Sequence, residues 1–584
     1  MNHNPSSGDI SFDAAINLLR ELFGFSDFLP FQQHVIEGII NGGDLLVVLP
    51  TGSGKSLCFQ IPALLRDGLT IVISPLIALM KDQVDALCAR RLPVACLHSA
   101  LPHSESKRIL DDIRDNRLKM VYISPERLRD GFFLNAVLAT GQRPPLWVVD
   151  EAHCITEWGH DFRTDYLNIP DAVELISSDS QLVMFTATAT PIVREDILRQ
   201  MRRESARTVC GGFDRPNLYL GCRDTPTKAE KLRTLSELLR RPGPGIIYTA
   251  TRRQCEDVNR FLQESSGKNS DFYHAGRSAG ERTEVHERFL ANEIEIVSAT
   301  NAFGMGVDKP DIRFIIHYAH PASIDAYYQE IGRGGRDCGR CDCILLFSRY
   351  DRKVQERFII DSTPGPDLVE DCFNAIIQTA AGLPSSGSPP GGSPARGLRE
   401  LILKRSFHEE HHVELFEMEK AGLLSRRTVM CGRASVYLSG DLGRALRLCS
   451  TEQMKVLVAL EKSLRLSRKG FAQSVDLNAF REEYFPETNL FALEQALLHM
   501  SNRDIIVYRP ADRSICYEVR ADSISSSVMR KMEESVSMRR AFKNRRLEMM
   551  IEYGALRSCL REYLLTALAD PTPKPTCGFC DNCL

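Results

Sequence analysis

Residues 47–56 have the sequence VVLPTGSGKS, in which an apolar run leads into a glycine-rich turn and then into a predicted helix. Gly52 and Gly54 let the backbone approach a triphosphate, whose charge is favoured by backbone N–H groups and by the helix N-terminus. Lys55 can reach the outer phosphates, and Ser56 can bind Mg²⁺. The stretch therefore predicts a nucleotide cradle made of Thr51, Gly52, Ser53, Gly54, Lys55 and Ser56.

A second apolar run ends in two adjacent carboxylates. Residues 146–153 have the sequence LWVVDEAH. A carboxylate at the end of a buried strand beside a phosphate cradle can hold Mg²⁺, and the next carboxylate can polarise the attacking water. We therefore assign Asp150 to the metal and Glu151 to the general base.

Strand-like and helix-like runs alternate around these motifs. Such alternation predicts an α/β fold with a parallel sheet, whose ligand-binding loops follow the strands. A second series of the same kind follows, without a cradle, so it must act on the nucleotide of the first. The predicted strands of the two series include 69–73, 94–97 and 120–123, and then 245–249, 271–274, 294–298 and 314–318.

The loop after the carboxylates, residues 154–163, is rich in aromatic and charged side chains. Trp158 and Phe162 could stack on unpaired bases, each stack contributing about 1–3 kcal/mol, and Arg163 could pair with a phosphate. The alternative is a buried aromatic cluster, since aromatic side chains more often serve cores.

Three motifs together resemble the RecQ family of superfamily two DNA helicases. They are the cradle, the DEAH sequence at 150–153, and QEIGRGGRD at 329–337. The resemblance covers about residues 12 to 350. It implies two RecA-like motor domains, ATP and Mg²⁺ as cofactors, and movement on single-stranded DNA with 3′-to-5′ polarity. It also implies that Trp158, His160, Phe162 and Arg163 couple DNA binding to hydrolysis.

The same resemblance assigns further nucleotide contacts. Phe25 would stack on adenine and Gln32 would bind its edge, the alternative being a hydrophobic cap on the first helix. From the second lobe, Arg336 would be the arginine finger, with Arg333 beside it. An arginine in that role can raise turnover by about three to five orders of magnitude when the cleft closes. Gly306 and Asp308, in the sequence GMGVD, would complete the site.

Beyond residue 350 the pattern becomes mainly helical. Helices over 451–464, 477–484 and 490–502, followed by a hairpin from 505–508 to 515–519, indicate a winged helix, which binds duplex DNA or other proteins. Before it we expect a mobile Pro/Gly/Ser-rich linker at 382–397, helices over 398–424 and a β-like stretch at 427–438. A long helix over 525–553 carries a basic run at 539–546, either a phosphate contact or a solvated face.

The C-terminal cysteines predict a zinc site. Three of them follow the knuckle spacing of CGFCDNC, residues 577–583, and four thiolates leave no open position for catalysis, so we expect a structural metal. Because the motor cleft lies in other domains, we expect basal hydrolysis to survive loss of zinc. The cluster at 338–343 lacks a nearby fourth ligand and predicts no metal. The expected zinc ligands are Cys559, Cys577, Cys580 and Cys583.

The remaining sequence properties constrain location and organisation. The 584 residues have a net charge of −3, so DNA binding must come from local patches. The polar start lacks the features of a signal peptide, and the other cysteines are scattered singly. Both observations favour the cytoplasm, which is a reducing compartment. The predicted domains are 1–210 (first motor), 211–350 (second motor), 351–445 (helical, winged-helix-like), 446–523 (winged-helix-like) and 524–584 (long helix and zinc module).

We therefore expect an ATP-dependent DNA helicase acting in repair or recombination, on single-stranded, branched or duplex DNA, with DNA-repair proteins as partners and a monomer favoured. The zinc module lies about 200 residues later than in the usual RecQ plan. This late position resembles that in a bacterial branch of the family. Two alternatives stay open: a translocase that does not separate strands, and a nucleotide-gated binding protein with little turnover.

Overall fold

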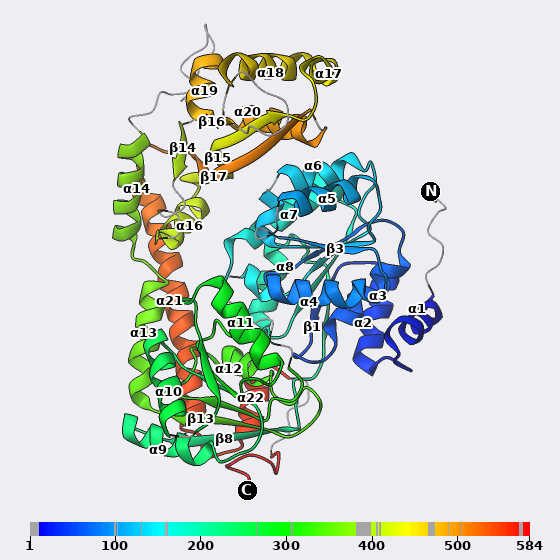
Figure 1. Ribbon diagram of the computed structural model, residues 1–584. Coiled ribbons are helices and arrows are strands. Elements are labelled where there is room, and N and C mark those ends of the chain that lie inside the picture. Colours follow the sequence, from blue (N-terminus) through cyan, green and yellow to red (C-terminus); the bar gives the residue numbers. More distant parts are fainter. Residues whose placement is uncertain are drawn as a thin grey trace. The chain divides into compact units, whose positions relative to one another are not determined.

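In the computed structural model, the chain folds into two compact units (Figure 1). Unit 1 comprises Met1–Pro125, Gly141–Ile360 and Arg539–Leu584, and unit 2 comprises Glu126–Thr140 and Asp361–Met538. The described residues are 11–98, 101, 103–129, 131–156, 158, 162–265, 267–304, 307, 309–380, 399–403, 407, 410–464, 473–488, 490–503, 505–570 and 576–584.

Unit 1 contains a seven-stranded parallel sheet, the first motor lobe, in the order β3-β4-β2-β5-β6-β1-β7. Its central strands are buried along their whole length, as expected when helices cover both faces of a parallel sheet. The strands are β1 (Leu45–Val48), β2 (Thr70–Ile73), β3 (Val94–Leu97), β4 (Met120–Ile123), β5 (Leu146–Val149), β6 (Gln181–Thr186) and β7 (Arg207–Cys210).

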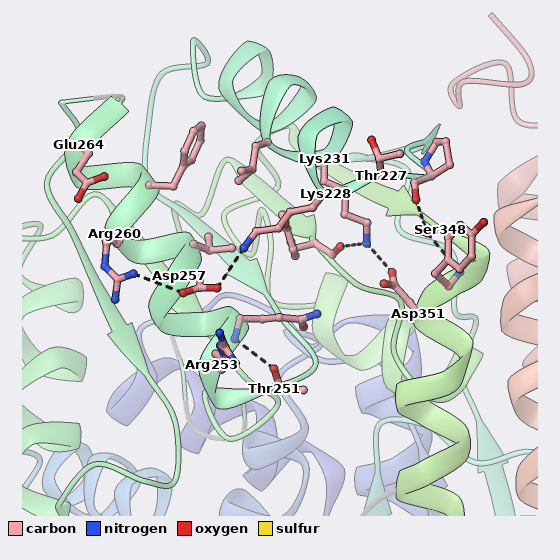
Figure 2. A pocket seen from close by; sticks show the side chains of 17 residues that line it. Thr227, Lys228, Lys231, Thr251, Arg253, Asp257, Arg260, Glu264, Ser348 and Asp351 are labelled. Carbon is pink, nitrogen blue, oxygen red and sulfur yellow. Dashed lines mark hydrogen bonds and ion pairs between the residues drawn. The ribbon is translucent and has the colours of Figure 1, made fainter.

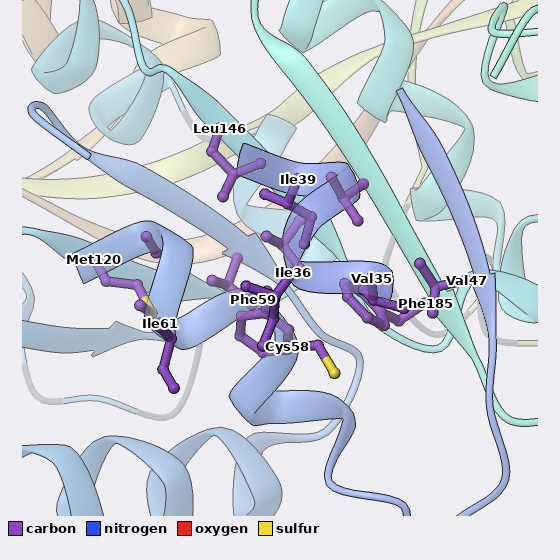
Figure 3. Packing of buried hydrophobic residues seen from close by; sticks show 14 of the residues in the cluster. Val35, Ile36, Ile39, Val47, Cys58, Phe59, Ile61, Met120, Leu146 and Phe185 are labelled. Atoms are coloured by element: carbon purple, nitrogen blue, oxygen red, sulfur yellow. The ribbon is translucent and has the colours of Figure 1, made fainter. Parts of the chain in front are cut away.

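Helices α2 (Pro30–Ile40) and α3 (Lys55–Leu65) pack on one face of this sheet. Figure 3 shows Phe59 of α3 among Val35, Ile36 and Ile39 of α2, close to Phe185 of β6, and the two phenylalanine rings lie 5.4 Å apart. This packing fixes the start of α3, and therefore the cradle, against the end of β1. The other helices of the lobe are α1 (Phe12–Leu18), α4 (Ile77–Cys88), α5 (His103–Arg114), α7 (Ile169–Ser177) and α8 (Pro191–Gln200).

A second parallel sheet, the second motor lobe, has the order β10-β11-β9-β12-β13-β8. The two predicted α/β lobes are thus confirmed. The strands are β8 (Leu218–Asp224), β9 (Gly245–Tyr248), β10 (Ser270–Tyr273), β11 (Ile296–Ala299), β12 (Phe314–His317) and β13 (Cys341–Phe347). The helices are α9 (Lys228–Leu238), α10 (Arg252–Ser265), α11 (Ala279–Leu290), α12 (Ile324–Ile331) and α13 (Arg352–Asp361).

The predicted long helix is also present, as α21 (Ser526–Gly554), and it is followed by α22 (Leu560–Ala567). The end of α21 packs tightly on the second lobe, since a Cβ added to Gly554 would lie 2.2 Å from the Phe347 ring. The C-terminal segment continues this contact through an isolated parallel bridge between Leu220 and Cys580. The predicted zinc module therefore lies against edge strand β8, although the two are far apart in sequence.

Unit 2 is built on a four-stranded antiparallel sheet in the order β14-β17-β15-β16, with β14 (Arg399–Leu403), β15 (Leu424–Leu438), β16 (Gln473–Asp476) and β17 (Ile506–Val519). Two predictions fail here. Residues 399–403 form a strand rather than a helix, because they pair with β17. Residues 506–519 form one long strand paired with β15, not a hairpin. The register shifts near Pro510, so a β-bulge accommodates this proline within the strand.

Helices pack around this sheet in two clusters, which share β15 and β17. The first includes α14 (Pro366–Ala380) and α16 (His412–Lys420). The second includes α17 (Leu442–Leu448), α18 (Thr451–Leu464), α19 (Leu477–Tyr484) and α20 (Leu490–Asn502), joined by α6 (Gly131–Ala139). β15 precedes the boundary predicted at residue 445 and β17 follows it, and the two strands pair within one sheet. The predicted linker at 382–397 lies outside the described residues. No described helix is long and apolar enough to cross a membrane.

Candidate functional site

The cradle occupies the turn between β1 and α3. Gly52 and Gly54 have φ angles of 78° and 75°, in the left-handed region that favours glycine. Lys55 begins α3, and neither its buried Nζ nor the buried Oγ1 of Thr51 has a hydrogen-bond partner within the described structure. Since a buried cation without a partner is unfavourable, the cradle suits an anionic ligand such as a triphosphate. Ser56 lies in the first turn of α3.

Gln32 is tied to this turn rather than left facing solvent. Its Nε2 donates to the carbonyl of Ser53 at 3.1 Å, and its Oε1 accepts from the N–H of Leu29 at 2.9 Å. A Cβ on Gly54 would lie 2.5 Å from the same Nε2, so the turn and α2 fit closely. Phe25 is 55% exposed and is therefore accessible to a planar ring.

The two predicted carboxylates are buried at the end of β5. Asp150 accepts hydrogen bonds from the N–H of Glu151 at 3.0 Å and from the hydroxyl of Ser74 at 3.3 Å. Burial disfavours a charged carboxylate, and the nearby negative charge of Glu151 disfavours a second one. Together they raise the pKa of Asp150 to about 6. Nδ1 of His153 lies 3.3 Å from Glu151 Oε2. A buried carboxylate pair beside a serine hydroxyl fits the oxygen ligands of Mg²⁺.

The loop after the carboxylates is connected to the same site. Tyr166 donates to the carbonyl of Asp150 at 3.0 Å, and Arg163 donates to the carbonyl of Pro75 at 3.0 Å. Arg163 thus joins this loop to the segment that follows β2. Trp158 and Phe162 are both half-buried. His160 lies outside the described residues.

The second lobe reaches the cradle through arginines. Nη1 of Arg215 donates to the carbonyls of Thr51 at 3.1 Å and Gly332 at 3.3 Å, while its Nη2 donates to two further carbonyls after α12. A Cβ on Gly52 would lie 3.3 Å from Cγ of Arg336, so this side chain passes directly over the turn. Arg333 is buried. Gly306 and Asp308 lie outside the described residues.

Arg215 was missed by the sequence analysis. It lies between the lobes in the sequence FDRPN, where an arginine is ordinary and no motif signals a role. Only the fold shows that its guanidinium, with five donors, bonds the carbonyls of both lobes at once.

A separate cavity of about 500 Å³ lies between α9 and α10 in the second lobe (Figure 2). At its base, buried Lys231 forms an ion pair with Asp351 at 2.6 Å, and burial lowers the pKa of this lysine. Asp257 also bridges two cations at the rim, Lys228 and Arg260. The lining therefore carries both signs of charge, and it contains none of the predicted nucleotide contacts.

The four predicted zinc ligands come together. All four sulfur atoms lie within 4.8 Å of one another, and the pairs Cys577/Cys583 and Cys559/Cys580 are each 3.9 Å apart. Tetrahedral zinc with Zn–S bonds of about 2.3 Å needs sulfur separations of about 3.8 Å, so the cluster fits this metal. Backbone hydrogen bonds lower the pKa of the Cys583 thiol to about 7, and the largest contribution comes from the hydrogen bond at Cys577. A lower pKa favours the thiolate form, which is the form that binds zinc.

Three family models match the chain in this order. They are the DEAD/DEAH box helicase at residues 29–197, the helicase conserved C-terminal domain at 230–338, and RecQ zinc-binding at 520–584. The first two coincide with the two motor lobes, and the third with the long helix and the cysteine cluster.

Curated relatives give the same result. The chain is 37% identical over 472 residues to the probable ATP-dependent DNA helicase RecS of Bacillus subtilis, covering 80% of this chain and 89% of that one. It is 40% identical to the ATP-dependent DNA helicase RecQ of the same organism, covering 60% of this chain and 58% of that one. The chain thus spans just over half the length of that RecQ protein.

Two motor lobes around a nucleotide cradle, with helicase models matching both, define an ATP-dependent helicase. The RecQ-type zinc module and the extent of the match to RecS narrow the class further. The chain belongs to the RecQ family of ATP-dependent DNA helicases.

Proposed function

We propose that this chain uses ATP and Mg²⁺ to move 3′ to 5′ along single-stranded DNA and to separate the strands of duplex or branched DNA, in repair or recombination. The observation that carries most weight is Arg215, which bonds the cradle of one lobe and the segment preceding the finger arginines of the other. Closure of the two lobes and completion of the nucleotide site are thereby one event.

In this proposal each side chain has a distinct role. Lys55 neutralises the outer phosphates, and Glu151 accepts a proton from the attacking water. Arg336, with Arg333 beside it, stabilises the charge that develops on the transferred phosphoryl group. Ser56 and Asp150 would hold Mg²⁺, which supplies charge neutralisation between phosphates when bound.

The loop containing Trp158 and Phe162 would sense the DNA strand. Arg163 supports this role, because it ties the loop to the segment after β2, which in a parallel fold lies at the ligand-binding edge of the sheet. Stacking of bases on the aromatic rings would then shift the same main chain that carries Asp150 and Glu151.

A strand-displacement assay tests the proposal. Duplexes with a 3′ tail, a 5′ tail or no tail are incubated with ATP and Mg²⁺, and release of the labelled strand is followed. We expect release from the 3′-tailed duplex only. DNA-stimulated hydrolysis without strand release would instead show a translocase, and DNA binding without hydrolysis would show a nucleotide-gated binding protein. Lys55→Ala is the matched inactive control.

Two further assignments complete the proposal. The antiparallel sheet and helices of unit 2 would contact duplex DNA, supported by the winged-helix-like succession of α18, α19 and α20 followed by a long strand. The protein would act as a monomer, which sedimentation with and without DNA would test.

A further inference from the structure

Arg546, near the end of α21, joins three parts of unit 1. Its Nη1 donates to the carbonyl of Trp158 at 2.8 Å. Its Nη2 donates to the hydroxyl of Ser323 at 3.0 Å and to Oδ2 of Asp325 at 2.8 Å. The side chains of Arg546 and Asp325 are only 12% and 9% exposed, so this is an internal connection and not a surface ion pair.

The ring of Trp158 is held by the same helix. Phe542 lies one turn before Arg546, and its ring meets Trp158 edge to face, with centroids 4.9 Å apart. The Arg546 guanidinium lies 5.6 Å from the Phe542 ring centroid. Helix α21 therefore holds both the main chain and the ring of the residue that we assign to DNA sensing.

At its other end this connection reaches the helix that precedes the finger arginines. Ser323 is the N-cap of α12, accepting from the N–H of Ala326 at 3.3 Å, and Asp325 lies in the first turn. α12 ends at Ile331, so its eight residues form a rod of about 12 Å. Gly332 follows it, and its carbonyl accepts from Arg215 beside the cradle.

We infer that Arg546 is a positioning residue that transmits the state of the Trp158 loop to the arginine end of α12. A shift of the loop changes the main-chain position at Trp158, and the rigid, two-sided guanidinium passes that change to Ser323 and Asp325. This inference rests on the proposed DNA-dependent ATPase. It also gives one member of the basic run a role other than phosphate contact.

The test measures ATP hydrolysis with and without single-stranded DNA, together with DNA affinity by fluorescence anisotropy. Arg546→Met keeps an apolar stem but removes the donors. We expect the ratio of DNA-stimulated to basal kcat to fall about tenfold, the change expected from losing one charge-assisted hydrogen bond. Basal kcat and DNA affinity should stay within about twofold of the wild-type values, since neither the cradle nor the aromatic rings are removed.

Two further variants separate transmission from simple stability. Arg545→Met is the matched control, because the Arg545 side chain is 70% exposed and forms a long surface ion pair with Glu552, at 3.9 Å. This variant should stay fully stimulated. Arg546→Lys retains charge and folding, but one ammonium cannot reproduce the planar fork to both lobes. We expect it to lose stimulation nearly as far as Arg546→Met, at an unchanged melting temperature.

Normal stimulation in both Arg546 variants would overturn the inference. So would a loss of DNA affinity in proportion to the loss of stimulation, which would make Arg546 a phosphate contact. Equal losses of basal and stimulated rates would show a purely structural role. These outcomes differ from failure of the proposed function, in which the wild-type protein itself would show no DNA stimulation.

Discussion

Lys55 is the residue whose environment most clearly calls for a ligand, because its buried ammonium has no hydrogen-bond partner within the described structure. Lys55→Ala should therefore abolish ATP hydrolysis and weaken nucleotide binding, since it removes the cation that neutralises the outer phosphates. Phosphate release and binding of a fluorescent ATP analogue measure the two effects. Hydrolysis at the wild-type rate would contradict the cradle assignment.

Glu151 should separate binding from turnover. Glu151→Gln keeps the shape of the side chain but cannot accept a proton, so nucleotide affinity should stay near normal while kcat falls at least about a hundredfold. Single-turnover hydrolysis measures the fall in the hydrolysis rate, and binding of the fluorescent ATP analogue measures nucleotide affinity as the control. A variant that hydrolyses ATP normally would exclude Glu151 as the base.

Trp158 should affect coupling more than chemistry. Trp158→Ala removes the ring that packs on Phe542 and that we expect to stack on bases, so DNA-stimulated ATPase should fall about tenfold while basal ATPase changes little. Rates at saturating and zero DNA measure the effect. An equal fall in both rates together with a lower melting temperature would make Trp158 a core residue.

Residues in short motifs were predictable because their chemistry requires fixed spacing. The cradle and the two carboxylates are predictable in this way, and the fold places them at the ends of β1 and β5, which flank β6 in one sheet. Arg215 is given no role by the sequence, and Arg546 is predicted only as part of a basic run, because each acts through contacts with residues more than a hundred positions away. Their roles depend on tertiary structure, and a single sequence carries no signal for them.

At the scale of elements, hydrophobic patterns predicted the parallel sheets well, since strands buried on both faces are short apolar runs between helices. They failed for β17, whose Pro510 and polar neighbours resemble a turn. The strand continues there because β15 pairs with it on both sides of the irregularity. Pairing between distant segments overrode the local preference.

The close contact between α21 and the second lobe makes a testable prediction about packing. Gly554→Ala would place a Cβ 2.2 Å from the Phe347 ring, so we expect a loss of about 1–3 kcal/mol from overpacking. Gly280→Ala is the matched control, because a Cβ on Gly280, in helix α11, meets nothing within 4 Å. This substitution should be neutral or slightly stabilising. Urea unfolding compares the two. Equal stability of both variants would show that α21 does not pack tightly there.

At the scale of the whole molecule, the zinc module supports the motor and is not a separate appendage. Arg561 of α22 donates to Asp214 and to the carbonyl of Arg215, both at 2.7 Å, and Asp570 accepts from the N–H of Phe213 at 2.5 Å. The module therefore holds the interlobe segment that carries Arg215. This changes the expectation that basal hydrolysis is independent of zinc.

Cys580→Ser should release the metal, destabilise the region from about residue 551 onward, and lower basal as well as DNA-stimulated hydrolysis. The reason is that α22 loses its anchor and Arg215 is no longer held against the cradle. Metal analysis should give about one zinc per wild-type chain and none in the variant. Cys338→Ser is a suitable control, since that exposed thiol lies outside the cluster. Unchanged basal hydrolysis by zinc-free protein would show that the interlobe segment is held without the module.

The hydrogen bond from Arg561 to Asp214 also has a consequence for biosynthesis. The two residues are 347 positions apart. At a translation rate of about 5–20 residues per second, Arg561 is therefore made about 20–70 s after Asp214. Once the second lobe is complete, after β13, the nascent motor has both lobes but still lacks the support that positions Arg215. We therefore expect a nascent chain to hydrolyse ATP more slowly than the complete chain until α22 has been made and Arg561 binds the interlobe segment.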